Sequence, residues 1–409
     1  MGLIFRLAWR NLWRQPKRTW LTIGAMLFSN VLLIFMMSLQ FGMYGLMIEN
    51  TLKAFTGHMQ VQAEGYVDDQ KMRQVVPDVR ALASTLREEL NSENVAARAR
   101  GFVLASSEER SYGIAVLGVE PAFEPVVSSV PGLVKQGRYL DSYDAAEIVV
   151  GAVLARNLKV GLGDEITLLG SGLDGSFAAT VVNVVGIFDS GIAELDRSIA
   201  EIPLGHFQDV FYMEGAGHEV VINAPDVEQA PALEARVQRL LPAGKDLVVQ
   251  DWNRLQPGLK QAIQADMSSS FFMYGILVVL VSFSVLNTQL MSVLERTREF
   301  GITMALGLKP QRLGWLVMLE TCLMGSIGVV LGALLGALLT SYFSSNGLVL
   351  PGMEEMAAQF NLPIRMYPRI TLLSLLAGPL VVFSFSLLAA IYPAVRLRWL
   401  QPVQAMRAA

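Results

Sequence analysis

The chain has 409 residues, of which 53% are hydrophobic and 17% charged, with a formal net charge of −4. Its mean hydropathy of +0.43 lies well above the range of ordinary soluble proteins. These values exclude a typical soluble globular protein and indicate a membrane protein, whose length also leaves room for a sizeable domain outside the bilayer.

The first 48 residues are predicted to form an amphipathic segment and then a membrane helix. Residues 1–19 combine arginines with apolar side chains, which suits a helix at the membrane surface, although an ordinary positively charged anchor explains the arginines equally well. Residues 20–48 exceed the roughly 20 apolar residues that cross a bilayer, so this helix is expected to continue as a stalk. A cleavable signal peptide would have a shorter apolar core.

Residues 49–266 are predicted to form a mixed α/β domain. They contain 18 basic and 31 acidic residues, whereas the remainder carries a net charge of about +9, and this asymmetry argues against nucleic acid as a partner. Helices are expected over residues 78–90 and 227–241. Valine- and isoleucine-rich segments predict strands over residues 58–63, 113–118, 147–150, 165–169, 180–188 and 219–222.

Three further apolar segments are predicted to cross the membrane, namely residues 267–294, 313–343 and 370–395. Pro379 is expected to kink the last of them.

Basic residues indicate how these segments are oriented. They gather before the first span, between the second and third, and after the fourth, and such positions are typical of cytoplasmic segments. Both termini, including the tail at residues 396–409, are therefore predicted to be cytoplasmic. Residues 49–266 and the loop at residues 344–369 are predicted to lie on the opposite side.

The segment between the second and third spans, residues 295–312, is charged, amphipathic and too polar for lipid. It suits a short cytoplasmic helix that docks onto a soluble partner. Charged side chains would supply polar contacts and apolar ones an anchor. The candidate docking residues are Glu295, Arg296, Arg298, Glu299, Phe300, Gly301, Ile302, Met304 and Leu306.

A stripe of small residues marks the third span, where glycines recur at spacings of three and four. Such a stripe lets another helix approach closely, and packing within the chain is favoured over a seam between two subunits. The residues are Gly325, Gly328, Gly332 and Gly336.

Methionines are frequent in the first two spans, and flexible thioethers suit a cavity that accepts varied acyl chains. Methionines at helical spacing also serve as packed or lipid-facing filler, so both interpretations stay open. The candidate cavity residues are Met36, Met37, Met43, Met47, Met267 and Met273.

Sequence patterns for catalysis or metal binding are missing. The chain contains no GxxxxGK[ST], GxSxG or HExxH pattern, and His58, His206 and His218 have no metal-ligand spacing. The chain is therefore expected to be no enzyme and to hold neither cofactor nor metal. Glu320 is the main ionisable residue inside a span, which gives little support to a proton or ion pathway.

Several motifs resemble, in order and spacing, the permeases of the MacB, lipoprotein-releasing (LolC/LolE) and FtsX-like ABC transporter superfamily. They are LAWRNLWRQPKRTWLTI at residues 7–23, ERTREFGITMALGLKPQRL at residues 295–313 and YPAVRLRWLQPVQAMR at residues 392–407. Residues 151–169 and 184–204 resemble the periplasmic core domain of the same group.

The resemblance implies a membrane α-helical fold of four transmembrane helices, with a mixed α/β periplasmic domain inserted between the first and second. Residues 1–19 would be an amphipathic elbow helix, and residues 295–309 the coupling helix that enters a groove of a separate ATPase. A dimer of that ATPase would bind ATP and Mg²⁺. The second permease subunit would be an identical copy or a paralogue, and the complex would lie in the bacterial inner membrane.

The function implied is release of a lipoprotein or another amphiphile from the inner membrane by mechanotransmission, with a periplasmic carrier or adaptor as a further partner. One departure bears on the carrier. The carrier-recruiting subunit of the lipoprotein-releasing group has an extended loop where residues 170–179 here form a short hairpin. A MacB-like exporter and an FtsX-like regulator of a cell-wall hydrolase stay open as alternatives.

Overall fold

The computed structural model describes residues 2–242, 244, 246–349, 352 and 365–399. It divides into a helical unit, residues 1–44, 263–350 and 365–409, and a β-rich unit, residues 45–262 and 351–364. Most of the predicted loop at residues 344–369 and most of the predicted tail at residues 396–409 lie outside the described residues.

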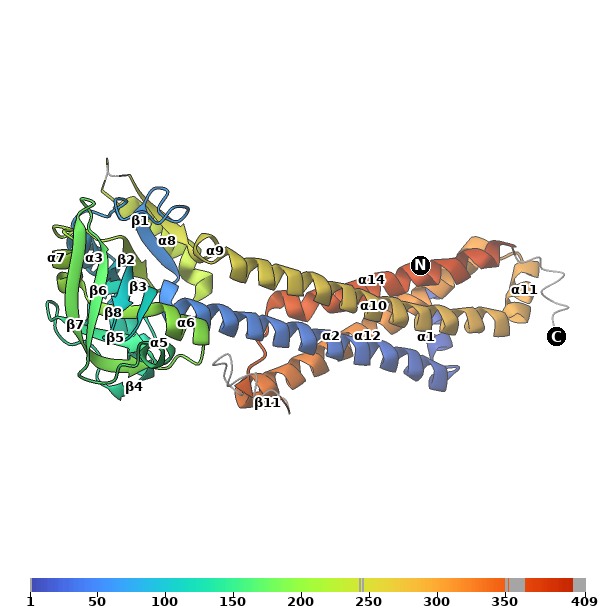
Figure 1. The fold of residues 1–409 in the computed structure, drawn as a ribbon. Helices are drawn as coiled ribbons and strands as arrows, with labels where there is room; N and C mark the ends of the chain where they lie inside the picture. Colours follow the sequence, from blue (N-terminus) through green and yellow to red (C-terminus); the bar gives the residue numbers. More distant parts are fainter. Residues whose placement is uncertain (1, 243, 245, 350–351, 353–364, 400–409) are drawn as a thin grey trace. The chain divides into compact units, whose positions relative to one another are not determined.

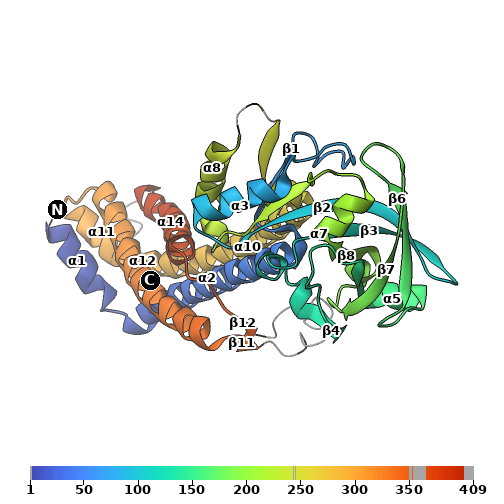
Figure 2. The same ribbon diagram turned by 90° about the vertical axis from the view of Figure 1, so that its left-hand side faces the viewer.

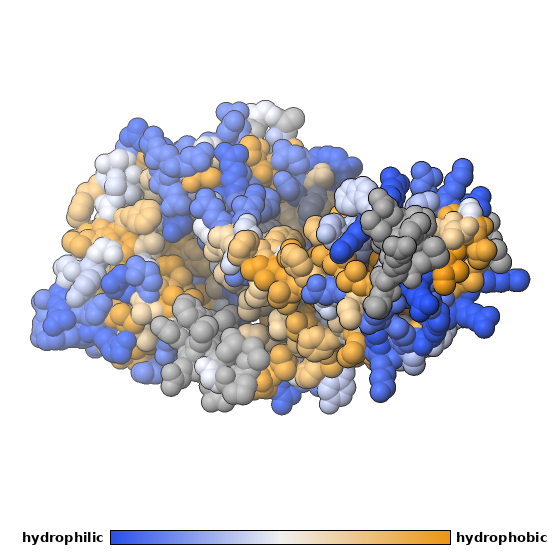
Figure 3. Space-filling view, turned by 90° about the vertical axis from the view of Figure 1, so that its right-hand side faces the viewer, coloured by the Kyte–Doolittle hydropathy of each residue, from blue (hydrophilic) through white to orange (hydrophobic). Residues whose placement is uncertain are grey.

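Long helices dominate the helical unit (Figure 1). Within the described residues, four helical segments are long and apolar enough to cross a membrane: Pro16–Thr56, Pro257–Glu295, Pro310–Asn346 and Leu372–Trp399. Apolar side chains gather over these helices in the space-filling view (Figure 3). The elements of this unit are α1 (Gly2–Leu12), α2 (Pro16–Thr51), α10 (Pro257–Glu295), α11 (Thr297–Ala305), α12 (Pro310–Asn346), α14 (Leu372–Arg396), η4 (Leu397–Trp399), β11 (Leu348–Val349) and β12 (Arg365–Met366).

The first two helices begin and end at slightly different residues than the sequence predicted. The chain turns after Leu12, and Pro16 begins α2, so the amphipathic helix is shorter than residues 1–19. Proline suits a first helical turn because its missing N–H would have no partner there. Pro379 lies inside the continuous helix α14.

The glycine stripe of α12 faces neighbouring helices of the same chain. A Cβ added at Gly328, Gly332 or Gly336 would lie 2.6–2.9 Å from side-chain atoms of α2, and one at Gly325 would lie 2.8 Å from Phe383 of α14. These distances are shorter than carbon atoms tolerate, so glycine permits the observed approach of the helices.

We expect Gly332→Ala to lower the stability of the helical unit by about 1–3 kcal/mol, because the new methyl group would meet the Asn30 Cβ at 2.6 Å. Gly24→Ala in α2 is the matched control, since no heavy atom lies within 4 Å of its added Cβ. Thermal unfolding of the purified protein in detergent measures both. Equal unfolding temperatures for the two variants would contradict the close packing described here.

The β-rich unit is built on a ten-stranded sheet in the order β10-β1-β9-β2-β3-β8-β5-β7-β4, and β6 pairs with β2 and β7. Figure 2 shows the unit from a second side. The strands are β1 (Met59–Ala63), β2 (Val95–Ser106), β3 (Ser111–Val119), β4 (Val134–Gly137), β5 (Glu147–Gly151), β6 (Glu165–Ser171), β7 (Phe177–Phe188), β8 (Ile199–Pro203), β9 (Glu219–Ile222) and β10 (Leu247–Asp251).

Helices and short turns cover both faces of this sheet. The larger core packs α3 (Val79–Leu90), α5 (Ala152–Leu158), α7 (Leu204–Val210) and α8 (Ala230–Leu240) against one face. Smaller clusters on the other face involve η1 (Leu52–Thr56), α4 (Glu124–Val127) and η2 (Val130–Leu133). The remaining short elements are α6 (Ala193–Ser198), η3 (Val227–Gln229) and α9 (Trp252–Leu255).

The six predicted strands and two predicted helices are confirmed within a few residues at their ends, and the mixed α/β prediction holds. The predicted hairpin is also confirmed, because β6 and β7 pair antiparallel and the Gly172 N–H donates to the Ser176 carbonyl at 2.9 Å. Strands β2, β4, β8 and β10 were not predicted.

A charged cluster is buried beneath β2 and β8. The Arg98 guanidinium binds both carboxylate oxygens of Glu124 and the Phe55 carbonyl, and Arg98 and Glu124 are fully buried. Glu201 is also fully buried and accepts a 2.6 Å hydrogen bond from the Tyr139 hydroxyl. Burial, and then the negative charge of Glu124, raise the pKa of Glu201 to about 8, so its carboxyl is largely protonated at neutral pH.

Candidate coupling site

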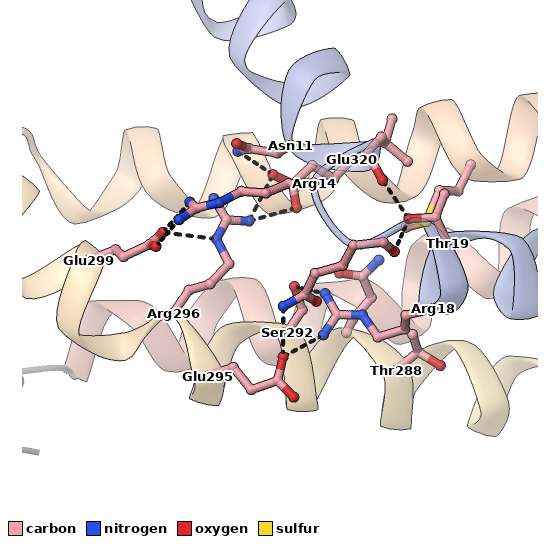
Figure 4. A pocket seen from close by; sticks show the side chains of 14 residues that line it. Asn11, Arg14, Arg18, Thr19, Thr288, Ser292, Glu295, Arg296, Glu299 and Glu320 are labelled. Carbon is pink, nitrogen blue, oxygen red and sulfur yellow. Dashed lines mark hydrogen bonds and ion pairs between the residues drawn. The ribbon is translucent and has the colours of Figure 1, made fainter. Parts of the chain in front are cut away.

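A polar cavity of about 200 Å³ lies in the helical unit where the first two helices meet the segment between α10 and α12. Its lining comes from α1, the α1–α2 turn, α2, α10, α11 and α12 (Figure 4). The labelled side chains point toward one another and join these elements through hydrogen bonds and ion pairs.

Glu320 is the most buried acid of this site, with 6% of its surface exposed on α12. It accepts from the Arg296 guanidinium at 3.0 and 3.2 Å and from the Asn11 amide at 2.7 Å (Figure 4). One carboxylate therefore connects α12 to α1 and to the residue between α10 and α11. Loss of either charged partner would leave the other charge poorly solvated.

A second group of contacts joins the start of α2 to the end of α10. The Arg18 guanidinium lies 2.9 Å from the Glu295 carboxylate and donates to the Ser292 hydroxyl at 2.6 Å. The Gln15 amide adds a 3.2 Å hydrogen bond to Glu295. These side chains are part exposed, so each contact contributes modestly to stability.

The third group of contacts, around Glu299, is the most exposed. Arg14 lies 2.7 Å from Glu299 of α11, with 64% and 44% of the two side chains exposed. Arg296 also lies 3.6 Å from Glu299 and stacks 4.9 Å from the Phe300 ring centroid. Three of the predicted docking residues, Glu295, Arg296 and Glu299, therefore have partners within the chain.

The apolar side of α11 is held against α10 and α12. Phe300 and Met304 are buried in a cluster with Val293, Leu313, Val317 and Leu397, and Gly301 is buried as well. Of the four apolar side chains predicted to anchor a partner, Phe300 and Met304 are thus packed inside the chain, and the anchoring role itself stays a prediction. A nine-residue helix needs this packing, because so short a helix is marginal on its own.

The outward side of α11 carries the remaining predicted docking residues. Arg298 is exposed, and 48% of Ile302 and 84% of Leu306 are exposed. A cation followed at helical spacing by two apolar side chains is suited to contact a soluble partner. The coupling role of residues 295–309 stays a prediction. Of the candidate docking residues, these three are the ones that a partner could contact directly.

Sequence reasoning missed the role in this site of the end of α1, the α1–α2 turn and the start of α2. Asn11, Arg14 and Arg18 looked like ordinary basic and polar residues at a membrane surface, and Glu320 looked like an isolated acid in a span. The opposite charges of Arg296 and Glu320 could have indicated their contact, because a charged residue at the edge of a membrane span usually needs a partner.

Comparison with known protein families identifies the family to which this chain belongs. A family model of the MacB-like periplasmic core domain matches residues 19–240, and one of the FtsX-like permease C-terminal region matches residues 271–402. The chain belongs to the MacB-like and FtsX-like family of ABC transporter permeases. The resemblance predicted from the sequence motifs is thus confirmed.

Individual relatives are distant. The permease is 27% identical over 317 residues to the lipoprotein-releasing system transmembrane protein LolC of Xylella fastidiosa, which covers 73% of this chain and 74% of LolC. It is 26% identical to LolE of Haemophilus influenzae, over 72% of each chain. It is 25% identical to the macrolide export ATP-binding/permease protein MacB of Marinobacter nauticus, over 69% of this chain and 42% of that protein.

An apolar groove of about 630 Å³ lies between α2, α10 and α14 of this permease. Its walls are almost entirely hydrocarbon, and several aromatic side chains contribute to them. The lining includes Leu33, Met37, Phe271, Phe272, Val279, Gly378, Val381 and Phe385.

The groove uses one of the six predicted cavity methionines. Met37 lines it, whereas Met36, Met43, Met47, Met267 and Met273 do not appear in its described lining. Met36, Met43 and Met273 are between 37% and 49% exposed on the helix surfaces. Phenylalanine, valine and other bulky apolar side chains form most of the wall, and such residues suit the same acyl-chain chemistry.

Proposed function

We propose that this permease extracts a lipoprotein or another acylated amphiphile from the membrane, driven by a separate ATPase. The apolar groove between α2, α10 and α14 is the observation that carries the proposal. Its volume of about 630 Å³ suits an acyl chain, and its lining offers little to a polar solute. The similarity to LolC and LolE, which belong to lipoprotein-releasing systems, supports the same cargo.

In this proposal the permease is not an enzyme and binds no cofactor, because ATP and Mg²⁺ bind to a dimer of the partner ATPase. The exposed side of α11, with Arg298, Ile302 and Leu306, docks onto that ATPase in the cytoplasm. The β-rich unit, inserted between the first and second membrane helices, lies in the periplasm of a bacterial inner-membrane complex. A second permease subunit, identical or paralogous, completes the transporter.

The short β6–β7 hairpin bears on what receives the cargo. Gly172 and Ser176 close it directly, which leaves no long loop there to recruit a periplasmic carrier. A carrier or adaptor would therefore contact another surface of the β-rich unit. An adaptor-linked exporter and a regulator of a cell-wall hydrolase are the competing functions.

Site-specific photo-crosslinking tests the proposal. We expect a benzophenone amino acid at Phe272, which lines the groove and is 74% exposed, to capture a lipoprotein or lipid in membranes that contain the intact transporter. The matched control is the same replacement at Phe283, an aromatic residue of the same helix that is 58% exposed and absent from the described lining.

The proposal predicts capture at residue 272 that is several-fold stronger than at residue 283 and that falls when ATP is added. Equal capture at the two positions would mean that bulk lipid alone reaches both, and would reject the groove as a substrate site. Capture of a cell-wall hydrolase with no lipid adduct would favour the regulator instead.

A further inference from the structure

A second cavity, of about 380 Å³, lies in the β-rich unit where β1, β2 and β9 meet η1 and α9. Unlike the groove between the membrane helices, it is lined by amides and by charges of both signs. Its walls include Phe55, Gln62, Arg100, Glu219, Arg254 and Gln256. The volume falls within the range of small-molecule sites in proteins.

A chain of hydrogen bonds fixes the orientation of one amide in this cavity. The Thr56 backbone carbonyl can only accept, and it takes a 2.7 Å hydrogen bond from the Gln60 Nε2. The Gln60 Oε1 must then face the Gln62 Nε2, which donates to it at 2.5 Å. Gln62 is 3% exposed, and its Oε1 is left buried with no partner.

A carboxylate lies next to this amide. Glu219 of β9 is directly opposite Gln62 of β1 in the antiparallel register, so both side chains project from the same face of the sheet. Glu219 is 3% exposed, and its Oε1 also lacks a partner. Two buried acceptor oxygens on neighbouring strands therefore lack a hydrogen-bond donor. Native proteins rarely leave such groups unsatisfied.

The same cavity holds a buried donor without a partner, the Nε of Arg100. The Arg100 guanidinium lies over the rings of Phe55 and Phe102, 5.8 and 5.7 Å from their centroids. At the rim, Arg254 lies 3.4 Å from Asp68, so these two charges offset each other. What the cavity presents to a ligand is a negative group at Glu219 and a positive group at Arg100.

We propose that this cavity binds a small zwitterion, a molecule that carries an ammonium group and a carboxylate or phosphate. The ammonium donates to Glu219 and Gln62, and the anionic group accepts from Arg100. A simple amine or a simple acid would satisfy one side of the cavity and leave the other unpaired. The inference does not rest on the proposed transport function, because the site is contained within the β-rich unit.

Calorimetric titration of the full-length permease in detergent at neutral pH tests the proposal. The probe is 4-aminobutanoate, with butylamine and butanoate as analogues that each lack one charge. We expect the zwitterion to bind at least about tenfold more tightly than either analogue. O-phosphoethanolamine, titrated in parallel, distinguishes a phosphate-bearing headgroup from an amino acid by the tighter of the two affinities.

Variants connect the binding to the cavity. Glu219→Gln should weaken zwitterion binding by about tenfold or more, and Glu165→Gln, an exposed acid of β6, should leave it unchanged. Combining Gln62→Glu with Glu219→Gln moves the carboxylate to the opposite strand and should restore most of the affinity. A purely structural role for Glu219 predicts no such recovery.

Three results would overturn the proposal. They are undetectable heat with both zwitterions, equal affinity for butylamine and 4-aminobutanoate, and unchanged binding in Glu219→Gln. The first would mean that the cavity holds water only.

Discussion

Glu124→Gln is expected to destabilise the β-rich unit by about 3–5 kcal/mol, because it leaves Arg98 charged and buried without its carboxylate. Arg98 and Glu124 are both fully buried, and the guanidinium meets both carboxylate oxygens. Glutamine accepts through one oxygen and carries no charge, so it replaces neither the geometry nor the electrostatic attraction.

Glu201→Gln is the matched comparison, since Glu201 is equally buried but largely protonated at neutral pH. The folded state holds the Glu201 proton up to about pH 8, whereas the unfolded chain releases it near the ordinary glutamate pKa of 4.5. The wild-type protein therefore loses stability as the pH rises through this interval, by up to about 1.4 kcal/mol per pH unit. Glu201→Gln should flatten that decline and should be more stable than the wild type at pH 8.

Hydrogen exchange of the full-length permease, read at the backbone amides of β2 and β3, measures both effects as free energies of opening. If Glu124→Gln unfolds the unit altogether, the double variant Arg98→Met with Glu124→Leu should restore a folded sheet, because it removes both charges. A loss below about 1 kcal/mol in Glu124→Gln would show that water reaches Arg98.

Glu320→Ala is expected to abolish productive coupling to the ATPase, with at least a tenfold fall in substrate-stimulated ATP hydrolysis by the assembled transporter. The change removes the acceptor shared by Arg296 and Asn11, and with it the polar contacts that tie α1 and the start of α11 to α12. Arg296, whose side chain is 15% exposed, would have to reorient toward solvent and carry α11 with it. This expectation rests on the proposed docking of α11.

Arg14→Ala is the control for Glu320→Ala, because the Arg14–Glu299 pair is exposed and worth roughly 0–1 kcal/mol. Its hydrolysis rate should stay within about twofold of the wild type. A structural readout separates the two variants independently of activity: a cysteine at Ile302 should change its labelling rate in Glu320→Ala and keep it in Arg14→Ala. Wild-type hydrolysis and labelling in Glu320→Ala would remove Glu320 from the coupling path.

The apolar framework was predictable because burial imposes a period on the sequence. Strands such as β5, β7 and β9 are rich in valine and isoleucine, and α3 shows apolar residues at helical spacing. β2 escaped prediction because its alanines and arginines, in VAARARGFVLAS, look like an exposed helical segment. Arg98 can be buried in this strand because it forms an ion pair with Glu124, which lies outside the strand. A local sequence pattern does not reveal such a pairing.

The short helix between the second and third spans was predicted correctly, but the sequence did not distinguish its two sides. Phe300 and Met304 are one helical turn apart and turn toward α10 and α12, whereas Ile302 and Leu306 turn outward. Both pairs are apolar, so composition alone could not decide which pair is buried. The same ambiguity meant that the sequence could not decide which of two neighbouring methionines lines the groove. In the structure it is Met37 and not Met36.

The position of β1 constrains how the permease is made. This strand lies between β9 and β10, and its first residue, Met59, is opposite Asp251. At about 5–20 residues per second, a nascent chain needs roughly 10–40 s to synthesise the segment between them. For most of that interval, until β9 is made, neither edge of β1 has a strand to pair with, and the edge that pairs with β10 stays open to the end, so the unfinished sheet is exposed to aggregation and to proteases. We therefore expect the early β segments of this protein to need protection until the last strand emerges.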